Sequence, residues 1–348
     1  MSKVVSIGNL KIGGGNKIAV QTMLDVKTSF VAEVKRKIEE VTALGCDIIR
    51  FSVKDESDAL AIKEIKKFSK IPLVADIHFD YRLALSAIDN GVDKIRINPG
   101  NIGSEKNVSE VAMAIKQNGV AVRVGSNSGS VEKGALSKYG KTEVALCESA
   151  LKNVAILEKY GVENIVISLK ASSVDLTVKA NRYINKLTDY PLHLGVTESG
   201  TLNMGIVKSS IGIGSLLLDG IGDTIRVSLT APITEEVIAA KRILRSVGLE
   251  KDFVEVISCP TCGRTGYDSI GLAKLVEERT SSYKKPLKVA VMGCVVNGPG
   301  EAKDCDIGIA GGDGKCVIFK KGEVYKTVDM ACAKEEFLKE IDLLLNEN

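Results

Sequence analysis

The residues best suited to bind a metal lie in two turns near the end of the chain. Cys259 and Cys262 belong to the run Cys-Pro-Thr-Cys-Gly-Arg, and Cys294 precedes the run Asn-Gly-Pro-Gly-Glu, which ends at Glu301. A Cys-x-x-Cys pair brings two thiols to one turn, and the glycines beside it let backbone N–H groups approach a bound group. Thiolates bind zinc and iron–sulfur clusters alike. The two turns therefore predict a metal centre of one of these kinds.

The number of available ligands bears on which metal is bound. A closed structural zinc site needs four ligands, commonly from two paired Cys motifs, but Cys294, Cys305 and Cys316 each stand alone. An iron–sulfur cluster can use three thiolates and leave one iron to a weaker, exchangeable ligand. Glu301 is placed for that role, and Cys305 is its rival as fourth ligand. The number of cysteine ligands therefore favours an iron–sulfur cluster over a zinc site, without excluding zinc.

A second group of residues suited to chemistry consists of cations near the ends of predicted strands. They are Arg50, Arg96, Arg123, Lys170 and Arg226. Because side chains alternate along a strand, the arginines share one face with the small or polar residue two positions on, while the apolar residues point the other way. The nearby carboxylates, Asp76 and Glu198, are too few to neutralise these cations. The pattern predicts an anionic ligand, and a ligand with two phosphates suits the number of cations.

The elements that carry these cations repeat along the first two thirds of the chain. Apolar, β-branched runs of strand length occupy Ile18–Met23, Asp47–Val53, Pro72–His78, Lys94–Asn98, Val120–Gly125, Asn164–Lys170, Pro191–Thr197 and Thr224–Leu229. Between them, apolar residues recur at helical spacing, and several of these stretches end at glycines: Gly45, Gly91, Gly119 and Gly161. Eight alternating strand–helix units predict an α/β fold of the (β/α)8 TIM-barrel type, whose active site forms at the carboxyl ends of the strands.

The remainder of the chain predicts smaller units. Residues 4–15 are typical of a hairpin with a Gly-Gly-Gly turn that plugs or caps the barrel. Residues 251–348 predict a small α+β domain that carries the cysteine turns, following a barrel domain of residues 1–250. The irregular segment 126–140, which begins near Asn127, is a candidate lid over a bound ligand.

Composition narrows the class of protein. The chain has 348 residues, a net charge of +3 with acidic and basic residues interleaved, and no long apolar run. These features favour neither a nucleic-acid-binding nor a membrane protein. The N-terminal residues have no apolar signal segment, so we expect a cytoplasmic protein with reduced thiols. Cys46, Cys147 and Cys332 lie in apolar contexts and are expected to be buried.

Taken together, the motifs resemble a known family over essentially the whole chain. They are Val20-Gln21-Thr22-Met23, Ala75-Asp76-Ile77-His78-Phe79-Asp80, Arg96-Ile97-Asn98-Pro99-Gly100-Asn101, Arg123-Val124-Gly125 with Asn127 and Gly129-Ser130, Ser168-Leu169-Lys170, Thr197-Glu198-Ser199-Gly200 and the two cysteine turns. As a set they resemble the bacterial two-domain 4-hydroxy-3-methylbut-2-en-1-yl diphosphate synthases of the non-mevalonate isoprenoid pathway.

The resemblance implies a reaction and a cofactor. These enzymes open the ring of 2-C-methyl-D-erythritol 2,4-cyclodiphosphate and remove an oxygen with two electrons, at a [4Fe–4S] cluster with one exchangeable iron ligand. Flavodoxin or ferredoxin would supply the electrons. The resemblance also implies a head-to-tail homodimer, in which the cluster of one chain caps the barrel of the other.

The resemblance further assigns roles to residues of this chain. Cys259, Cys262, Cys294 and Glu301 would hold the cluster, with Glu301 yielding to the substrate's oxygen. The diphosphate would be bound by Arg50, Arg96, Arg123, Lys170 and Arg226. Asn98, Asn127, Thr197 and Ser228 would assist, together with His78, and Glu198 is a candidate proton donor or polar anchor. His78, Glu198 and Glu301 are therefore the predicted catalytic residues.

Two other interpretations are weighed against this one. A zinc-stabilised barrel could act as a phosphosugar aldolase or isomerase through a Schiff base on Lys170. Such an enzyme would contain tight zinc, no chromophore and need no reductant. A non-catalytic iron–sulfur redox sensor would instead need a partner-binding or nucleic-acid-binding surface, for which the sequence offers no basic helix or added domain.

Overall fold

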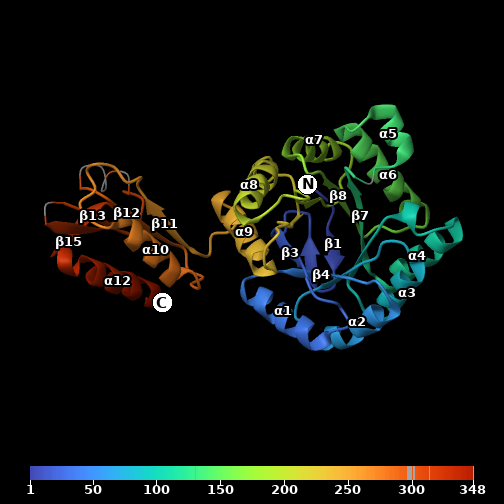
Figure 1. Cartoon of the computed structure of the whole chain (residues 1–348), viewed down its shortest axis with the longest axis horizontal. Coiled ribbons are helices and arrows are strands. Elements are labelled where there is room, and N and C mark those ends of the chain that lie inside the picture. The colour runs from blue at the N-terminus through green and yellow to red at the C-terminus, as the bar shows by residue number, and fades with distance from the viewer. Residues whose placement is uncertain (130, 296–299, 301, 313, 348) are drawn as a thin grey trace. The chain divides into compact units, whose positions relative to one another are not determined.

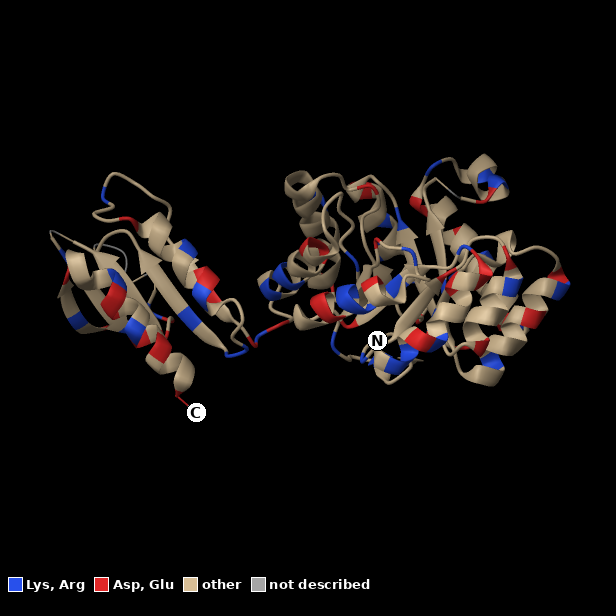
Figure 2. Ribbon diagram, turned by 60° about the horizontal axis from the view of Figure 1, so that its bottom comes forward, with Lys and Arg blue, Asp and Glu red and all other residues tan. Residues whose placement is uncertain are grey.

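The computed structural model describes residues 1–129, 131–295, 300, 302–312 and 314–347. Contacts divide the chain into two compact units, Met1–Leu249 and Glu250–Asn348. Acidic and basic residues are interspersed along helices of both units (Figure 2). Among the described residues, no helix combines the length and the apolar character needed to cross a bilayer.

Unit 1 is built around a ring of parallel strands, in the hydrogen-bonded order β8-β7-β6-β5-β4-β3-β10-β9. The strands are β3 (Ala19–Met23), β4 (Ile48–Ser52), β5 (Leu73–Asp76), β6 (Lys94–Ile97), β7 (Ala121–Asn127), β8 (Ile165–Lys170), β9 (His193–Leu194) and β10 (Thr224–Ile225). A parallel bridge between Ile167 and Leu192 joins the two ends of this order and closes the barrel. The predicted TIM-type fold is confirmed.

The helices of unit 1 form the outer ring of the barrel (Figure 1). They are α1 (Val31–Ala43), α2 (Glu56–Phe68), α3 (Tyr81–Asp89), α4 (Glu105–Asn118), α5 (Lys133–Tyr139), α6 (Glu143–Lys159), α7 (Val174–Ile184), α8 (Leu202–Leu218) and α9 (Ile233–Ser246), with a short 3-10 helix at Pro99–Asn101. Local chemistry sets many of their ends. Ser104 caps α4 by accepting from Asn107 N–H, and Gly119 ends it at φ 63°.

The N-terminal strands β1 (Val5–Ile7) and β2 (Leu10–Ile12) form the predicted hairpin. The predicted Gly-Gly-Gly turn is wrong, because Ile7 pairs with Leu10 and the turn is therefore Gly8-Asn9. Gly8 has φ 57°, which a two-residue hairpin turn requires. The hairpin packs its apolar residues against interior side chains at the amino ends of the barrel strands, including Ala19 and Ile48. It is a plug at the end of the barrel opposite the predicted site.

Unit 2 is a five-stranded mixed sheet with two helices. Strands β11 (Val254–Ser258), β12 (Leu287–Met292) and β13 (Ile307–Gly311) are parallel neighbours, and β14 (Lys315–Lys320) and β15 (Glu323–Asp329) continue the sheet antiparallel. Helices α10 (Ser269–Thr280) and α12 (Met330–Asn346) share one apolar core with the sheet. Because β11 and β12 are parallel, the turns that follow them lie at the same edge.

Two elements differ from the sequence-based prediction. Part of the segment expected to be irregular, residues 126–140, is helix α5, which has no buried residue and therefore no apolar periodicity to reveal it. Strand β15 was not predicted either. Six of its seven residues are exposed, as suits an edge strand, so it lacks the alternation of a half-buried strand.

Candidate active site

A polar cavity of about 130 Å³ lies inside unit 1. Its lining consists of Arg50, Arg96, Arg123, Gly125, Asn127, Ser168, Lys170, Thr197, Arg226 and Ser228. All five predicted anion-binding cations are in this set, and so are three of the predicted assisting residues. They come from β4, β6, β7 and β8 and from the segments after β9 and β10, at the carboxyl ends of the strands. The cations that the sequence placed on the same face of their strands therefore line one cavity.

Asp76, at the end of β5, links two of the cations. Its carboxylate accepts from Arg50 Nη2 at 2.5 Å and from Arg96 Nη1 at 3.5 Å, and it lies 3.3 Å from His78 Nε2. Burial works to raise the pKa of Asp76, but the hydrogen bond with His78 and the charges of the two arginines outweigh it and hold the pKa well below its usual range. Asp76 therefore remains ionised and holds the two arginines in place.

Arg226 is held by a carboxylate from a helix. Glu236, buried on α9, lies 3.5 Å from Arg226 Nη2 and also accepts from Thr22 Oγ1 at 2.6 Å and from Leu229 N–H at 3.0 Å. Burial lowers the pKa of Arg226, and the charge of Glu236 partly restores it. Sequence reasoning missed Glu236, which stands ten positions after Arg226 on another element.

Arg123 and Lys170 differ from the other cations because neither has a salt bridge among the described residues. Arg123 is 3% exposed, and its Nε and Nη1 have no hydrogen-bond partner in that part of the chain. Lys170 is 7% exposed. Burial, followed by the charges of neighbouring arginines, lowers the pKa of both groups well below the usual values. Buried donors without acceptors are costly, so this half of the cavity is built for an anion.

Gly195 makes room for Lys170. A Cβ atom added at Gly195 would lie 2.9 Å from Lys170 Nζ and 2.7 Å from the carbonyl oxygen of Arg226. Real Cβ atoms do not approach other atoms so closely without displacement. The missing side chain at Gly195 thus leaves the space that the end of the Lys170 side chain occupies.

Three predicted residues are not among those that line the cavity. Asn98 accepts from Gly100 N–H at 3.1 Å, capping the 3-10 helix after β6, and it lines a neighbouring cavity of about 570 Å³. His78 lies at the rim, with its side chain 57% exposed and directed to Asp76. Glu198 is exposed and has φ 53°, a strained conformation for a residue with a side chain.

A buried polar layer lies below these cations. It includes Gln21, Lys94 and His193, none of which we predicted as a site residue. Lys94 Nζ donates to Gln21 Oε1 at 3.4 Å, and His193 Nδ1 lies 2.7 Å from Thr224 Oγ1. Lys94 is in phase with Arg96 and Asn98, so strand alternation was the signal that could have revealed it.

The predicted metal ligands lie in unit 2, where the structure joins the two cysteine turns. Cys259 follows β11 and Cys294 follows β12, and these strands pair in parallel, with Ser258 opposite Val291. Gly293 N–H donates to Cys259 Sγ at 3.1 Å, and Gly266 N–H donates to Gly293 O at 3.2 Å. A backbone donor directed at a thiol is the kind of contact that stabilises a thiolate in a cluster.

The Cys262 thiol is exposed. Hydrogen bonds from the backbone and the side chain of Arg264 lower its pKa, which favours the thiolate needed for metal binding. Within the described part of the chain, no group of three or more His, Cys, Asp or Glu side chains is gathered as a metal site. Glu301, the predicted fourth ligand, lies outside the described residues.

The other cysteines separate by position. Cys305, the rival ligand, is buried and precedes β13, at the end of the sheet opposite the turns after β11 and β12. Strand geometry puts roughly 15 Å between these two ends. Cys46 and Cys147 are buried as predicted, and burial raises the pKa of each to about 12. The prediction for Cys332 is wrong, because it is exposed on α12.

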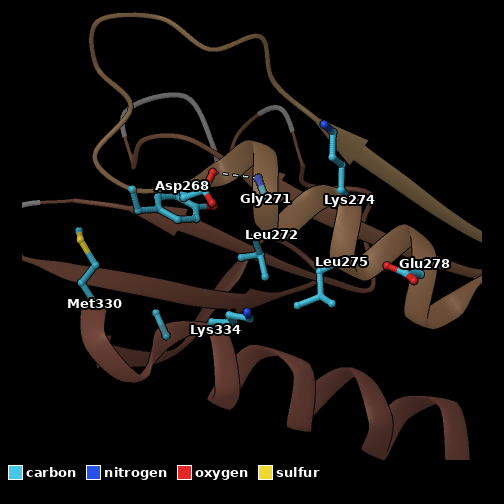
Figure 3. A pocket seen from close by; sticks show the side chains of 10 residues that line it. Asp268, Gly271, Leu272, Lys274, Leu275, Glu278, Met330 and Lys334 are labelled. Atoms are coloured by element: carbon cyan, nitrogen blue, oxygen red, sulfur yellow. Dashed lines mark hydrogen bonds between the residues drawn. The ribbon is translucent and has the colours of Figure 1, made fainter.

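A groove of about 560 Å³ runs between α10 and α12 of unit 2 (Figure 3). Leu272, Leu275 and Met330 lie between the two helices, and Asp268 caps α10 by accepting from Gly271 N–H at 2.9 Å. Tyr267 also lines the groove and donates its hydroxyl to Met292 O at 3.0 Å, beside the second cysteine turn. The groove is mainly apolar and lacks the converging polar groups of the barrel cavity.

Comparison with family models gives two matches. A model described as the GcpE TIM-barrel domain matches residues 2–241, and one described as the GcpE protein C-terminal domain matches residues 255–343. Among solved structures, a 3-dehydroquinate dehydratase from Geobacillus kaustophilus aligns with TM-score 0.50 at 15% identity, covering 71% of this chain and all of its own. A Plasmodium falciparum HPPK-DHPS chain aligns with TM-score 0.53 at 15% identity, covering 71% of this chain and 48% of its own. At such identities these likenesses show the barrel fold alone.

Curated relatives are much more similar. The protein from Caldanaerobacter subterraneus named 4-hydroxy-3-methylbut-2-en-1-yl diphosphate synthase (flavodoxin) is 59% identical, over all of this chain and 98% of its own. The protein of the same name from Clostridium perfringens is 53% identical over 99% of both chains. The resemblance inferred from the motifs is thus confirmed. The chain belongs to the GcpE family, that of the 4-hydroxy-3-methylbut-2-en-1-yl diphosphate synthases.

Proposed function

We propose that the protein converts 2-C-methyl-D-erythritol 2,4-cyclodiphosphate to (E)-4-hydroxy-3-methylbut-2-en-1-yl diphosphate. The reaction opens the cyclic diphosphate and consumes two electrons and two protons, and one oxygen leaves as water. Names of relatives at 49–59% identity support this assignment. Within it, residues 1–250 bind the substrate and residues 251–348 carry the cluster.

The observation that carries the proposal is the excess of buried positive charge in the barrel cavity. Five cations line it, and the salt bridges described for them involve Asp76 and Glu236 alone. Three positive charges therefore lack a neutralising partner among the described residues. A diphosphate supplies that negative charge together with several oxygens that accept bidentate hydrogen bonds from guanidinium groups.

The chain's own residues divide the work at the substrate. Arg123 and Lys170 bind phosphate oxygens, and the Nε and Nη1 donors of Arg123 have no acceptor among the described residues. Asp76 and Glu236 orient Arg50, Arg96 and Arg226 toward the same cavity, with Asn127, Thr197 and Ser228 beside them. Such fixed charges stabilise the phosphate as it leaves the reacting carbon. Asn98, His78 and Glu198 are proposed to act at the rim, the last two as candidate proton donors.

The cysteine turns suit an iron–sulfur cluster by their donor chemistry. Cys259, Cys262 and Cys294 would hold a [4Fe–4S] cluster, with Glu301 as the exchangeable fourth ligand. The N–H group of Gly293 on Cys259 Sγ and the Arg264 contacts that lower the pKa of Cys262 both favour thiolates. When bound, the cluster would supply a Lewis-acidic iron and would pass on, one at a time, the two electrons that the carrier protein delivers.

Three further assignments rest on the family. We propose that flavodoxin, named for the relatives, or ferredoxin delivers the electrons. We also propose a head-to-tail homodimer, in which one chain's cluster serves the other chain's barrel. A reducing cytoplasm suits the thiolate ligands.

The test begins with protein purified without oxygen. Iron, sulfide and zinc are measured per chain with a visible spectrum, and the cyclic diphosphate is then added with reduced flavodoxin while the product is followed by ³¹P NMR. We expect about four irons, four sulfides and a broad absorption near 400 nm, with formation of a linear diphosphate. One zinc per chain without colour would instead favour the aldolase interpretation.

Two variants separate the cluster ligands. Cys294→Ser should lose the cluster, whereas Glu301→Ala should keep most of its iron and lose turnover. Cys332→Ser is the matched control, because it removes an exposed thiol on α12 and should keep both. A fully active Glu301→Ala protein would exclude that carboxylate from the reaction.

A further inference from the structure

Lys94 is fully buried inside the barrel, with 0% of its surface exposed. It stands on β6, two residues before Arg96, so its side chain enters the interior one layer below that arginine. The residues paired with it on the neighbouring strands are Val74 and Ala121, which offer no polar group. Its hydrogen bond within the described chain is the long one to Gln21 Oε1, and no described carboxylate pairs with it.

Several polar nitrogen atoms near Lys94 are buried and unpaired. Gln21 Nε2, His193 Nε2 and the Nε and Nη1 of Arg123 are all buried without a partner among the described atoms. Burial first, and then the charges of Arg123 and Arg50, lower the pKa of Lys94 well below its usual value. A buried ammonium in this position is opposed by dehydration and by like charges.

The groups that face Lys94 can be followed strand by strand. Gln21 on β3 is its hydrogen-bond partner, and the charges of Arg50 on β4, Arg123 on β7 and His193 on β9 interact with it. The other charged groups of the interior belong to the cavity layer above: Asp76 on β5, Lys170 on β8 and Arg226 after β10. Burial and the charges of Lys170, Arg123, Lys94 and Arg50 also lower the pKa of His193 well below its usual value. A diphosphate in the cavity above would add negative charge next to Lys94 and His193 and would favour their protonated forms.

We propose that Lys94 takes up a proton when an anionic diphosphate fills the cavity above it. The added positive charge of Lys94 then attracts the diphosphate electrostatically from the layer below, so Lys94 is a positioning residue for the anion. This inference rests on the proposed function, because it requires the cavity to bind a diphosphate. Beyond that function, anion binding in the cavity is coupled to protonation of Lys94, which does not line the cavity.

Inorganic pyrophosphate is the probe that tests the coupling. Its binding to the full-length, anaerobically purified protein is measured by calorimetry in two buffers of different ionisation enthalpy, which yields the number of protons taken up. We expect Lys94→Met to take up fewer protons than the unchanged protein, by up to one per chain. Its affinity should fall about tenfold for each unit by which binding raises the pKa of Lys94.

Lys63→Met is the matched control, because Lys63 is exposed on α2 and should leave proton uptake unchanged. If the unchanged protein does not bind pyrophosphate, the proposed anion site itself is wrong. If it binds but Lys94→Met takes up as many protons, the role of Lys94 alone is overturned.

A second measurement covers the case in which Lys94→Met does not fold. The Lys170→Arg protein, labelled with ¹³C-lysine, retains Lys94 as the buried lysine of the barrel interior. Pyrophosphate should move one lysine ¹³Cε resonance from the neutral to the charged position. A resonance in the charged position before and after addition would overturn the proposal.

Discussion

Replacing Gly195 by alanine should weaken anion binding through Lys170. The new Cβ would lie 2.9 Å from Lys170 Nζ and 3.2 Å from its Cε, and 2.7 Å from the carbonyl oxygen of Arg226. The flexible lysine must give way, and the contact with the carbonyl oxygen is relieved only if the backbone also shifts. Overpacking of this kind costs about 1–3 kcal/mol of stability. Loss of one hydrogen bond between the ammonium and a phosphate oxygen costs about 1.5–3 kcal/mol of binding.

The assay is pyrophosphate binding by calorimetry together with thermal unfolding of the free protein. The binding loss corresponds to a roughly 10- to 150-fold rise in Kd. Gly134→Ala is the control, because its Cβ on α5 would meet its nearest neighbour at 3.9 Å, and it should leave Kd unchanged. A double-mutant cycle locates the cause: in a Lys170→Met background, Gly195→Ala should raise Kd by much less. An equal rise in both backgrounds would refute the route through Lys170.

Three other changes test the rest of the site. Glu198→Gly should raise the free energy of unfolding by about 1 kcal/mol, because glycine adopts a positive φ without strain. The variant should also have lower turnover. An unchanged free energy of unfolding in denaturant titrations would show that Glu198 is not strained. In protein stripped of metal, Cys262 should be alkylated before Cys46 and Cys147, since its pKa is lowered while theirs are raised to about 12. The order is measured by peptide mass spectrometry after brief iodoacetamide treatment. Earlier alkylation of Cys46 or Cys147 would contradict the prediction. Asp76→Asn should remove the stabilisation that the ionised carboxylate gives to the folded state. That stabilisation is fully present above the unfolded carboxyl pKa of about 3.9 and is lost as the pH falls toward the lower folded pKa. The free energies of urea unfolding of the variant and the unchanged protein should therefore differ less at pH 3 than at pH 7.

The features that the sequence predicted correctly are governed by local rules. Strand alternation placed the five cations on one interior face, and helix-ending glycines such as Gly91 and Gly119 have the expected positive φ. These outcomes depend on neighbours within a few residues, so a single sequence contains the information. Elements without a buried face, α5 and β15, were missed because local patterns report burial and these elements have little.

The site residues that sequence reasoning misjudged use their side chains in contacts that strand alternation does not reveal. Asn98 shares the phase of Arg96, yet its side chain is used to cap the next turn, a competition that alternation does not express. Glu236 became the partner of Arg226 only because α9 packs against β3. The contact with Thr22 joins residues 214 positions apart, and the contact with Arg226 requires α9 to pack beside the barrel, so residue type and spacing could not identify Glu236.

Lys94 shows how burial can change the meaning of a residue type. On a surface strand, a lysine two positions before an arginine is an ordinary solvated cation. In this barrel its paired neighbours are apolar and the groups above it are cationic, so the same residue is held where an ammonium is unfavourable without added negative charge. Stability alone does not explain a lysine there, because methionine would fill similar volume without that cost. A charge on Lys94 becomes favourable only when an anion occupies the cavity, which makes the charged form of Lys94 a property of the bound state.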